Sequence, residues 1–142
     1  MENVAQVIIV RRDLGMPAGK IIAQACHASM AAITNCLTVQ DNGDSVTYSM
    51  TVPKESAIHV WLSGAFTKIA VWAQDEQHLL ELVAKADAAG LLTSKIVDSG
   101  RTVFNGVPTL TCACIGPASK EQRADITNGL QMIGNIKKGA TE

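Results

Sequence analysis

Residues 4–35, which read VAQVIIVRRDLGMPAGKIIAQACHASMAAITN, decide the fold. Residues 4–10 are a short apolar run rich in β-branched side chains, which is typical of a strand buried on both faces. From Lys20 to about Asn35, small and apolar residues recur at helical spacing, and Pro17 suits a first helical turn. These recurring positions are Ile21, Ala25, Ala28, Ala32 and Cys36. The segment therefore predicts a strand, a loop and a helix.

Later apolar runs repeat this alternation. They predict strands at residues 68–73, 93–98 and 109–115, and a helix over residues 76–89. Asp75 is a good N-cap for that helix, and Gly90 ends it. Strands that alternate with helices form one sheet covered by helices on both sides. We therefore expect an α/β protein whose residues 1–142 make a single domain, with functional residues at the ends of strands.

Three segments are less regular. The turn sequence Asp41-Asn42-Gly43-Asp44 predicts either a β-hairpin or a loose excursion over residues 38–50. Residues 53–63 can form a helix that Gly64 stops. A capping box of Ser119 and Gln122 opens the last helix. On that helix we expect Ile126, Leu130 and Ile133 to align, and we expect the tail from Gly134 to fray.

Composition excludes several classes of protein. Hydrophobic residues make up 47% of the 142 residues and charged residues 18%, so disorder is not expected. The net charge of −1 and the pI of about 6.3 argue against a generally basic, RNA-holding surface. Residues 21–37 contain too many polar side chains for a membrane span, and the N-terminus lacks a signal-peptide pattern. These features predict a cytoplasmic protein.

The four cysteines suggest packing rather than metal binding. They are Cys26, Cys36, Cys112 and Cys114, and none forms a C-x-x-C pair. Cys112 and Cys114 lie two residues apart in an expected strand, so their side chains point to the same face. We expect all four to be buried, reduced thiols.

Residues 15–20, GMPAGK, lie between a strand and a helix, as a phosphate-binding P-loop would. That motif needs four residues between its glycines and a Ser or Thr after the lysine, whereas here three residues intervene and Ile21 follows. Nucleotide triphosphate hydrolysis is therefore not expected. A lysine beside free backbone N–H groups at a helix N-terminus still attracts an anion, although a solvated Lys20 is the plainer interpretation.

Asp98 ends an expected strand and is followed by Ser99-Gly100-Arg101-Thr102. An aspartate at this position is often only a turn-former. If Asp98 meets Lys20 in the fold, the carboxylate could accept a hydrogen bond from water while the lysine stabilises developing negative charge. His27 lies two helical turns after Lys20, so it falls near the same helix face, where a packing role is the commoner one.

Several separated segments together resemble the archaeal-type (type two) peptidyl-tRNA hydrolase family. The matching segments are IVRRDL at residues 9–14, GKIIAQ at 19–24, CHA at 26–28, residues 79–90, residues 98–102 and residues 111–117. They cover most of the chain outside residues 35–67. Matches in the same order along the chain are more specific than any one motif alone.

The resemblance implies a three-layer α/β/α fold on a mixed, roughly four-stranded sheet, a homodimer, and no metal or organic cofactor. It implies hydrolysis of the ester that joins a peptide to the 3′ ribose of tRNA. The family's functional lysine and aspartate fall on Lys20 and Asp98. Its threonines fall on Thr102 and, allowing one inserted residue near Val107, on Thr111.

Further roles follow as hypotheses. His27 is a candidate proton relay, and the side chains expected to bind substrate are Arg11, Gln24, Lys68 and Arg101. Compared with the family, Gly15 and Ala18 replace lysines of the first loop, and Trp72 replaces a lysine at the end of the second strand. Because these changes remove positive charge, we expect weak, salt-sensitive contacts with tRNA. They also leave open a non-catalytic binding or regulatory domain of the same fold.

Overall fold

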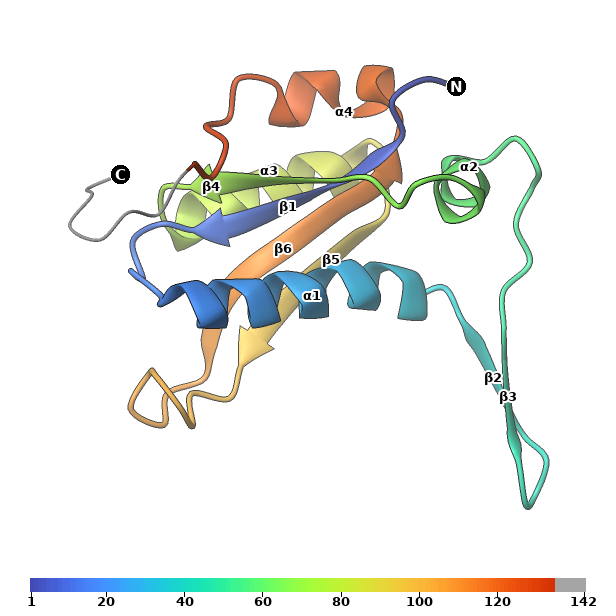
Figure 1. Cartoon of the computed structure of the whole chain (residues 1–142), viewed down its shortest axis with the longest axis horizontal. Helices are drawn as coiled ribbons and strands as arrows, with labels where there is room; N and C mark the ends of the chain where they lie inside the picture. The colour runs from blue at the N-terminus through green and yellow to red at the C-terminus, as the bar shows by residue number, and fades with distance from the viewer. Residues whose placement is uncertain (135–142) are drawn as a thin grey trace.

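The computed structural model describes residues 1–134, and strands and helices alternate along it as the sequence predicts (Figure 1). The elements are β1 (Ala5–Arg11), α1 (Ala18–Thr34), β2 (Thr38–Asp41), β3 (Val46–Ser49), α2 (Ala57–Ser63), β4 (Lys68–Ala73), α3 (Glu76–Ala88), β5 (Thr93–Asp98), β6 (Thr109–Ala118) and α4 (Lys120–Thr127). The predicted α/β class is confirmed.

The main sheet has the strand order β4-β1-β6-β5. Strand β1 runs parallel to β4, whereas β6 runs antiparallel to both β1 and β5. The predicted mixed, four-stranded sheet is therefore confirmed. Because β1, β4 and β5 all run in the same direction, their carboxyl ends and the first residues of β6 lie at one edge of the sheet. That edge is where ligands of open α/β sheets collect.

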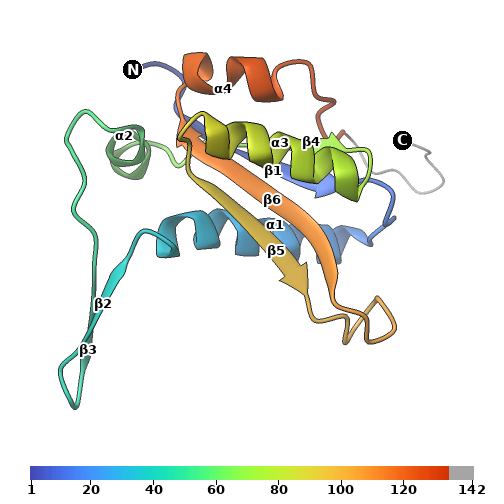
Figure 2. The same cartoon turned by 180° about the vertical axis from the view of Figure 1, so that it is seen from behind.

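Helices cover both faces of this sheet, because alternate strand residues point to opposite sides. Ile8 and Val10 of β1 pack toward α1 with Cys112 and Cys114 of β6. On the other face, the intervening residues of β1 pack with Leu79 of α3 and Ile126 of α4. Figure 1 shows α1 in front of the sheet, and Figure 2, seen from the opposite side, shows α3 in front of the sheet and α4 above it.

Helix α2 is shorter than predicted. It begins at Ala57 rather than at residue 53, with Ser56 as the N-cap that accepts a hydrogen bond from the backbone N–H of His59. The Ser56 hydroxyl and backbone N–H both donate to the carbonyl of Pro53, which closes a turn ahead of the helix. The expectation of helix over residues 53–56 is therefore wrong.

The end of the last helix differs from the prediction as well. The capping box of Ser119 and Gln122 is present, but α4 ends at Thr127. Gly129 has a φ of +85°, which turns the chain out of the helix. Leu130 and Ile133 therefore do not continue its apolar face. Instead residues 131–133 run along the edge of β4, where Trp72 N–H donates to Gln131 and Ile133 N–H to Ala70.

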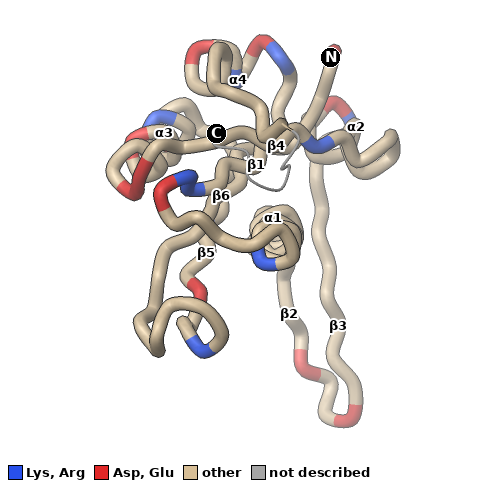
Figure 3. The backbone as a smooth tube through the Cα atoms, turned by 60° about the vertical axis from the view of Figure 1, so that its left-hand side comes forward, with Lys and Arg blue, Asp and Glu red and all other residues tan. Residues whose placement is uncertain are grey.

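Strands β2 and β3 form a β-hairpin, the first of the two predicted alternatives, and it projects away from the body of the protein (Figure 1). All eight strand residues are exposed. Residues 38–49 include Asp41 and Asp44 and no lysine or arginine, and the tube view shows only acidic positions on this arm (Figure 3).

The prediction for the thiols is only half correct. Cys112 and Cys114 are buried, and both lie on the α1 face of the sheet as expected. Cys26 is exposed and Cys36 is partly exposed, because their positions on α1 and after its end do not face the sheet. No helix among residues 1–134 is long and apolar enough to cross a membrane. The expected fraying of the tail concerns residues 135–142, which lie outside the described residues.

Candidate active site

Lys20 lies in the first turn of α1, at the carboxyl edge of the sheet. Its ammonium group donates to Asp98 Oδ1 over 2.9 Å and to Thr102 Oγ1 over 2.8 Å. Lys20 Nζ also lies 6.0 Å from the centre of the Phe104 ring. The end of β5 and the loop after it thus surround the lysine with a carboxylate, a hydroxyl and an aromatic ring.

Asp98 is the last residue of β5, and both of its carboxylate oxygens are engaged. Oδ1 accepts from Lys20 and from Gln24 Nε2, the latter over 3.3 Å, and Oδ2 accepts from the backbone N–H of Gly100 over 2.9 Å. The hydrogen bond from Lys20, followed by that from Gly100, lowers the pKa of Asp98 below its ordinary value. The nearby His27 lowers it further. Asp98 is therefore a carboxylate throughout the neutral range.

Gly100 is required by the turn that delivers this N–H group. Its φ is +83°, and a Cβ atom there would collide with the backbone of Val107. The loop closes on itself through hydrogen bonds from Gly106 to Gly100 and from Val107 to Phe104. A side chain at position 100 would displace the loop and with it the donor to Asp98.

A buried chain of hydrogen bonds supports Asp98 from below. Thr111 is fully buried and donates to Gln24 Oε1 over 2.5 Å, and the amide of Gln24 donates in turn to Asp98. Gln24 is 2% exposed, so its side chain faces the sheet rather than the solvent. Gln24 was expected to bind substrate, but its side chain is buried against the sheet. There it links Thr111 of β6 to Asp98 of β5.

Two further predicted residues lie around the same edge. Lys20, Gln24 and His27 follow one another at helical spacing, which places them on the side of α1 that faces β5 and β6. His27 is exposed and close enough to Asp98 to affect its pKa. Arg101 is exposed in the loop directly after Asp98. The structure thus places His27 near the pair, and Arg101 lies three residues after Asp98 in the chain.

Arg11 also lies at this edge, but it is engaged with another residue. Its guanidinium donates to both carboxylate oxygens of Asp13, over 3.1 and 2.7 Å, and to the carbonyl of Leu110 over 2.9 Å. The hydrogen bond from Arg11 lowers the pKa of Asp13. Much of the positive charge that the sequence offered to a phosphate is therefore neutralised by a neighbouring carboxylate.

Lys68 is not part of this site. It begins β4, which runs parallel to β1, so it lies at the opposite end of the sheet from Asp98. Its ammonium group donates to the carbonyl of Phe66 over 2.8 Å and lies 5.2 Å from the Trp61 ring centre. The strand direction separates Lys68 from the other candidate residues, and nothing in the residue pattern alone gave that direction.

Sequence reasoning missed the place of Phe104 beside the lysine, since a phenylalanine in a polar loop carries no specific signal. Among residues 1–134, no group of three or more His, Cys, Asp or Glu side chains is arranged to hold a metal ion. The chemistry available at the carboxyl edge of the sheet therefore comes from Lys20, Asp98 and their hydrogen bonds.

Comparison with known proteins identifies the kind of chain that carries this arrangement. Residues 4–133 match the family described as Peptidyl-tRNA hydrolase PTH2. The chain belongs to this family. The peptidyl-tRNA hydrolase of Methanococcus maripaludis is 31% identical over 128 residues, which span 90% of this chain and 97% of that protein.

Eukaryotic proteins of similar name match as well. Probable peptidyl-tRNA hydrolase 2 of Dictyostelium discoideum is 33% identical over 127 residues, covering 89% of this chain and 53% of its own length. Peptidyl-tRNA hydrolase 2 of Saccharomyces cerevisiae is 32% identical over 130 residues, covering 92% of this chain and 58% of its own length. The family resemblance that the motifs predicted is therefore confirmed.

In this member of the family, Trp72 occupies the place where the family resemblance led us to expect a lysine. It is 6% exposed and packs on the α1 face of the sheet. The Arg12 guanidinium lies 5.7 Å from its ring centre. An apolar ring thus replaces a cation at the end of β4, so this edge carries less positive charge than the resemblance implied.

Proposed function

We propose that this protein hydrolyses the ester that joins a peptide, or an N-blocked aminoacyl group, to the 3′ ribose of tRNA. Membership of the peptidyl-tRNA hydrolase family supports the reaction. The observation that carries the proposal is the contact of Lys20 with Asp98 at the carboxyl edge of the sheet. A non-catalytic domain of the same fold is not favoured, because that domain would have no need to assemble this pair.

Lys20 stabilises the negative charge that develops on the ester carbonyl oxygen. An ammonium group has three N–H donors, and two of them donate to Asp98 and Thr102. The third donor can reach an oxyanion. Because the lysine is already held in place, little reorganisation is needed when the charge develops. Without its hydrogen bonds to Asp98 and Thr102, the flexible side chain of Lys20 would not hold its ammonium group in one orientation.

Asp98 positions the attacking water. Its lowered pKa makes it a weak base, so it serves better to accept a hydrogen bond from water than to remove a proton completely. Attack of the water oxygen on the carbonyl carbon forms a tetrahedral intermediate. Collapse of that intermediate breaks the bond to the ribose oxygen, which takes up a proton as it leaves. The products are a peptide carboxylate and free tRNA.

The remaining residues have supporting roles. His27, exposed near Asp98, relays the proton between the attacking water and the leaving oxygen. Thr102 fixes the lysine directly, whereas Thr111 acts through Gln24. Arg101 contacts a phosphate or the ribose near the 3′ end. No cofactor takes part in the proposed reaction.

Contacts with the tRNA backbone are weak and depend on salt. Of the cations expected to bind phosphate, Lys68 lies at the far end of the sheet, and Arg11 and Lys20 are paired with carboxylates. A slope of about −1 for log K against log[salt] would fit a single phosphate contact, made by Arg101. Filter binding of tRNA at KCl concentrations from roughly 50 to 300 mM measures this slope.

The protein also forms a homodimer in this proposal. An apolar groove along α1 supports it, lined in part by the exposed side chains of Ile22, Met30 and Phe66. Ala25 and Ser29 line the groove as small residues, whereas Ala32 packs into the core and does not contribute. Light scattering should give twice the chain mass. Cys26 lines the same groove, so its reaction with a thiol reagent should slow as the dimer forms.

The proposed place of action is the cytoplasm, where peptidyl-tRNA from interrupted translation arises. We also propose that the chain is one domain, because both hydrophobic clusters pack on the same sheet.

Incubation with an N-acetylaminoacyl-tRNA tests the reaction, with release of free tRNA followed on acidic gels. We expect release by the unaltered protein and by Lys95→Gln, which removes an exposed cation of β5 outside the site. Release by Asp98→Asn at the same rate would refute the assigned site, and no release by any of the proteins would refute the reaction.

A further inference from the structure

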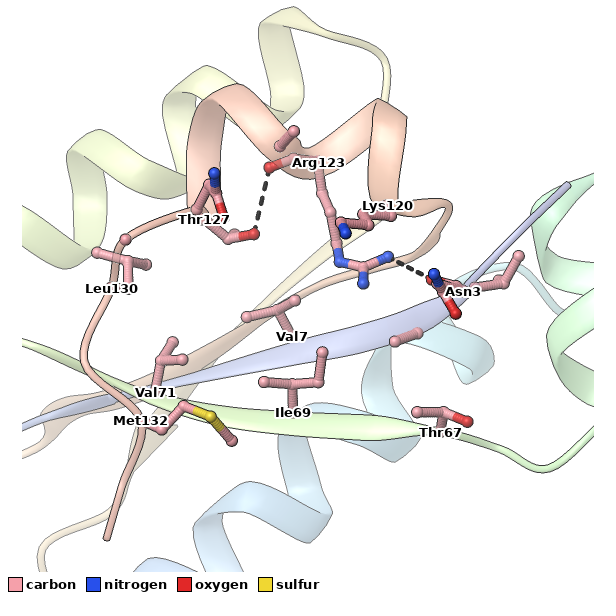
Figure 4. A pocket seen from close by; sticks show the side chains of 15 residues that line it. Asn3, Val7, Thr67, Ile69, Val71, Lys120, Arg123, Thr127, Leu130 and Met132 are labelled. Atoms are coloured by element: carbon pink, nitrogen blue, oxygen red, sulfur yellow. Dashed lines mark hydrogen bonds between the residues drawn. The ribbon is translucent and has the colours of Figure 1, made fainter.

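A second cavity lies on the face of the sheet that α4 covers, and nothing in the proposed reaction uses it. It has a volume of about 460 Å³ and lies between α4 and strands β1 and β4 (Figure 4). Val7, Ile69 and Val71 form an apolar floor, and Met132 lies beside them. Lys20 and Asp98 belong to the α1 side of the sheet, so the sheet separates them from this cavity.

Arg123 of α4 projects into this cavity. The residue is 7% exposed, and its Nη1 donates to the carbonyls of Asn3 and Ala118, each over 2.7 Å. These two bonds fasten the start of β1 to the end of β6. A guanidinium has five N–H donors, and Figure 4 shows its other two nitrogens turned toward the space above Val7. Arg123 therefore has donors left over inside a largely buried space.

The charge of Arg123 is not balanced within the cavity. The residues that line the cavity include Lys120 as a second cation and no aspartate or glutamate. Burial lowers the pKa of Arg123, and no carboxylate among residues 1–134 acts to raise it again. A buried cation without a counter-charge is unfavourable, because it has lost much of its hydration. An anion bound in the cavity would supply that missing charge.

The shape of the free donors indicates which anion fits. The N–H groups of Nε and Nη2 point in parallel from one side of the guanidinium, and this spacing matches the two oxygens of a carboxylate. The apolar floor beside them would cover a hydrocarbon body rather than a second polar group. Cavities of this size commonly hold small molecules.

We propose that this cavity binds a carboxylate that carries an apolar body. Arg123 binds the carboxylate through two hydrogen bonds, Lys120 adds attraction from the rim, and the floor of β1 and β4 covers the apolar part. Such a carboxylate can be a free aliphatic acid or the C-terminal residue of an apolar peptide. The inference does not rest on the hydrolysis reaction, since the residues of the two sites are different.

The test is an NMR titration of the full chain with matched pairs of probes. Octanoate is compared with octanamide, and N-acetyl-leucyl-leucine with its C-terminal amide. We expect the acids to shift the backbone signals of residues 120–130 and 67–71, and the amides to bind about tenfold or more weakly, because each lacks the charge-assisted bonds. The stronger binder of the two acids identifies the source of the ligand.

Three variants locate the binding. Arg123→Lys keeps the charge but loses the parallel donors, and it should weaken octanoate binding by about tenfold or more. Lys120→Gln removes an exposed charge without disturbing the core, so it should fold normally and weaken binding by a few fold at low salt. Lys95→Gln, the matched control on β5, should bind like the unaltered protein.

Equal affinity for the acid and its amide would overturn the proposal, because the cavity would then bind the apolar body alone, without a contribution from Arg123. Signal shifts confined to α1 and residues 98–104 would overturn it too, by placing the acid in the hydrolytic site. If Arg123→Lys does not fold, the other two comparisons still test the proposal. It would be refuted if Lys120→Gln binds octanoate as tightly as the unaltered protein does and octanamide binds as tightly as octanoate.

Discussion

Lys20 Nζ lies 2.9 Å from Asp98 Oδ1, although 78 positions separate the two residues in the sequence. Their side chains are only 14% and 11% exposed. One opens the helix after β1 and the other ends β5, and both positions fall at the carboxyl edge because the two strands run in the same direction. The strand arrangement thus builds the charged pair from the start of a helix and the end of a strand that lie far apart in the sequence.

The pH dependence of stability should report this pair. The pKa of Asp98 is lowered in the folded protein, so the stabilisation by its charge is fully present above the unfolded pKa of about 3.9 and is lost as pH falls through the folded value. Melting temperatures of the unaltered protein and of Asp98→Asn should therefore differ by a constant amount above about pH 5. The difference should shrink only below about pH 4. A difference that disappears between about pH 5 and 6 would mean that the carboxylate is not held as described.

Thr111→Val tests the buried support of Asp98. Valine fills similar space but leaves Gln24 Oε1 without its donor, which should cost about 1–3 kcal/mol of stability. Because Gln24 then no longer fixes Asp98, kcat should fall by up to about a hundredfold while KM changes little. Thr111→Ser keeps the hydroxyl and should restore kcat. If serine fails to restore it, Thr111 acts by packing alone.

The hairpin of β2 and β3 should be dispensable for folding. All of its strand residues are exposed, so replacing residues 38–49 by a short Gly-Ser linker removes little buried surface. We expect the melting temperature to change by about 2 °C or less, since surface changes usually stay within about 0.5 kcal/mol. A larger loss, measured by thermal melts, would show that the arm packs against something in solution.

The two buried thiols should be inert in the folded protein. Burial raises the pKa of Cys112 to about 11 and that of Cys114 to about 12, so few thiolates exist at pH 8. At a protein concentration low enough to keep the chain monomeric, a colorimetric thiol reagent should label exposed Cys26 first and reach Cys112 and Cys114 only with unfolding in urea. Removing Cys26 as Cys26→Ser should abolish the first phase. Rapid labelling of three or more thiols in native buffer would contradict the burial described.

Much of the fold could be predicted because the apolar pattern is strong where the core is. Residues 7–10 form an uninterrupted apolar run, and such runs occur in strands covered on both faces. The ends of α2 and α4 were harder to predict. Pro53 and Leu130 both fit a helical pattern, but a turn closed by Ser56 and the positive φ of Gly129 decide the actual ends.

The site could be predicted in part for a different reason. Lys20 and Asp98 were identified by family motifs, and their contact depends on strand order, which no local pattern contains. Because the sequence pattern does not give the direction of the strands, it grouped Lys68 with the other cations. Lys68 in fact begins β4 at the far end of the sheet. Burial could not be predicted for Gln24, because a glutamine on a helix is usually exposed.

The decisive prediction is that Lys20 and Asp98 act as one unit in hydrolysis. Lys20→Met and Asp98→Asn should each lower kcat/KM by about 10²–10⁴-fold with little loss of folding. The lysine is oriented by the aspartate, and the aspartate is held in place by the lysine, so each single change already disables both groups. The double variant should therefore be scarcely slower than either single variant, because residues that act together have non-additive effects.

Rates of tRNA release from N-acetylaminoacyl-tRNA by the four proteins measure this coupling, and thermal melts verify that each is folded. Lys95→Gln serves as the control for removal of a lysine outside the site. A near-normal rate in either folded single variant would remove that residue from the mechanism. Losses that multiply in the double variant would show that Lys20 and Asp98 contribute independently to the reaction, and that the 2.9 Å contact does not couple their roles.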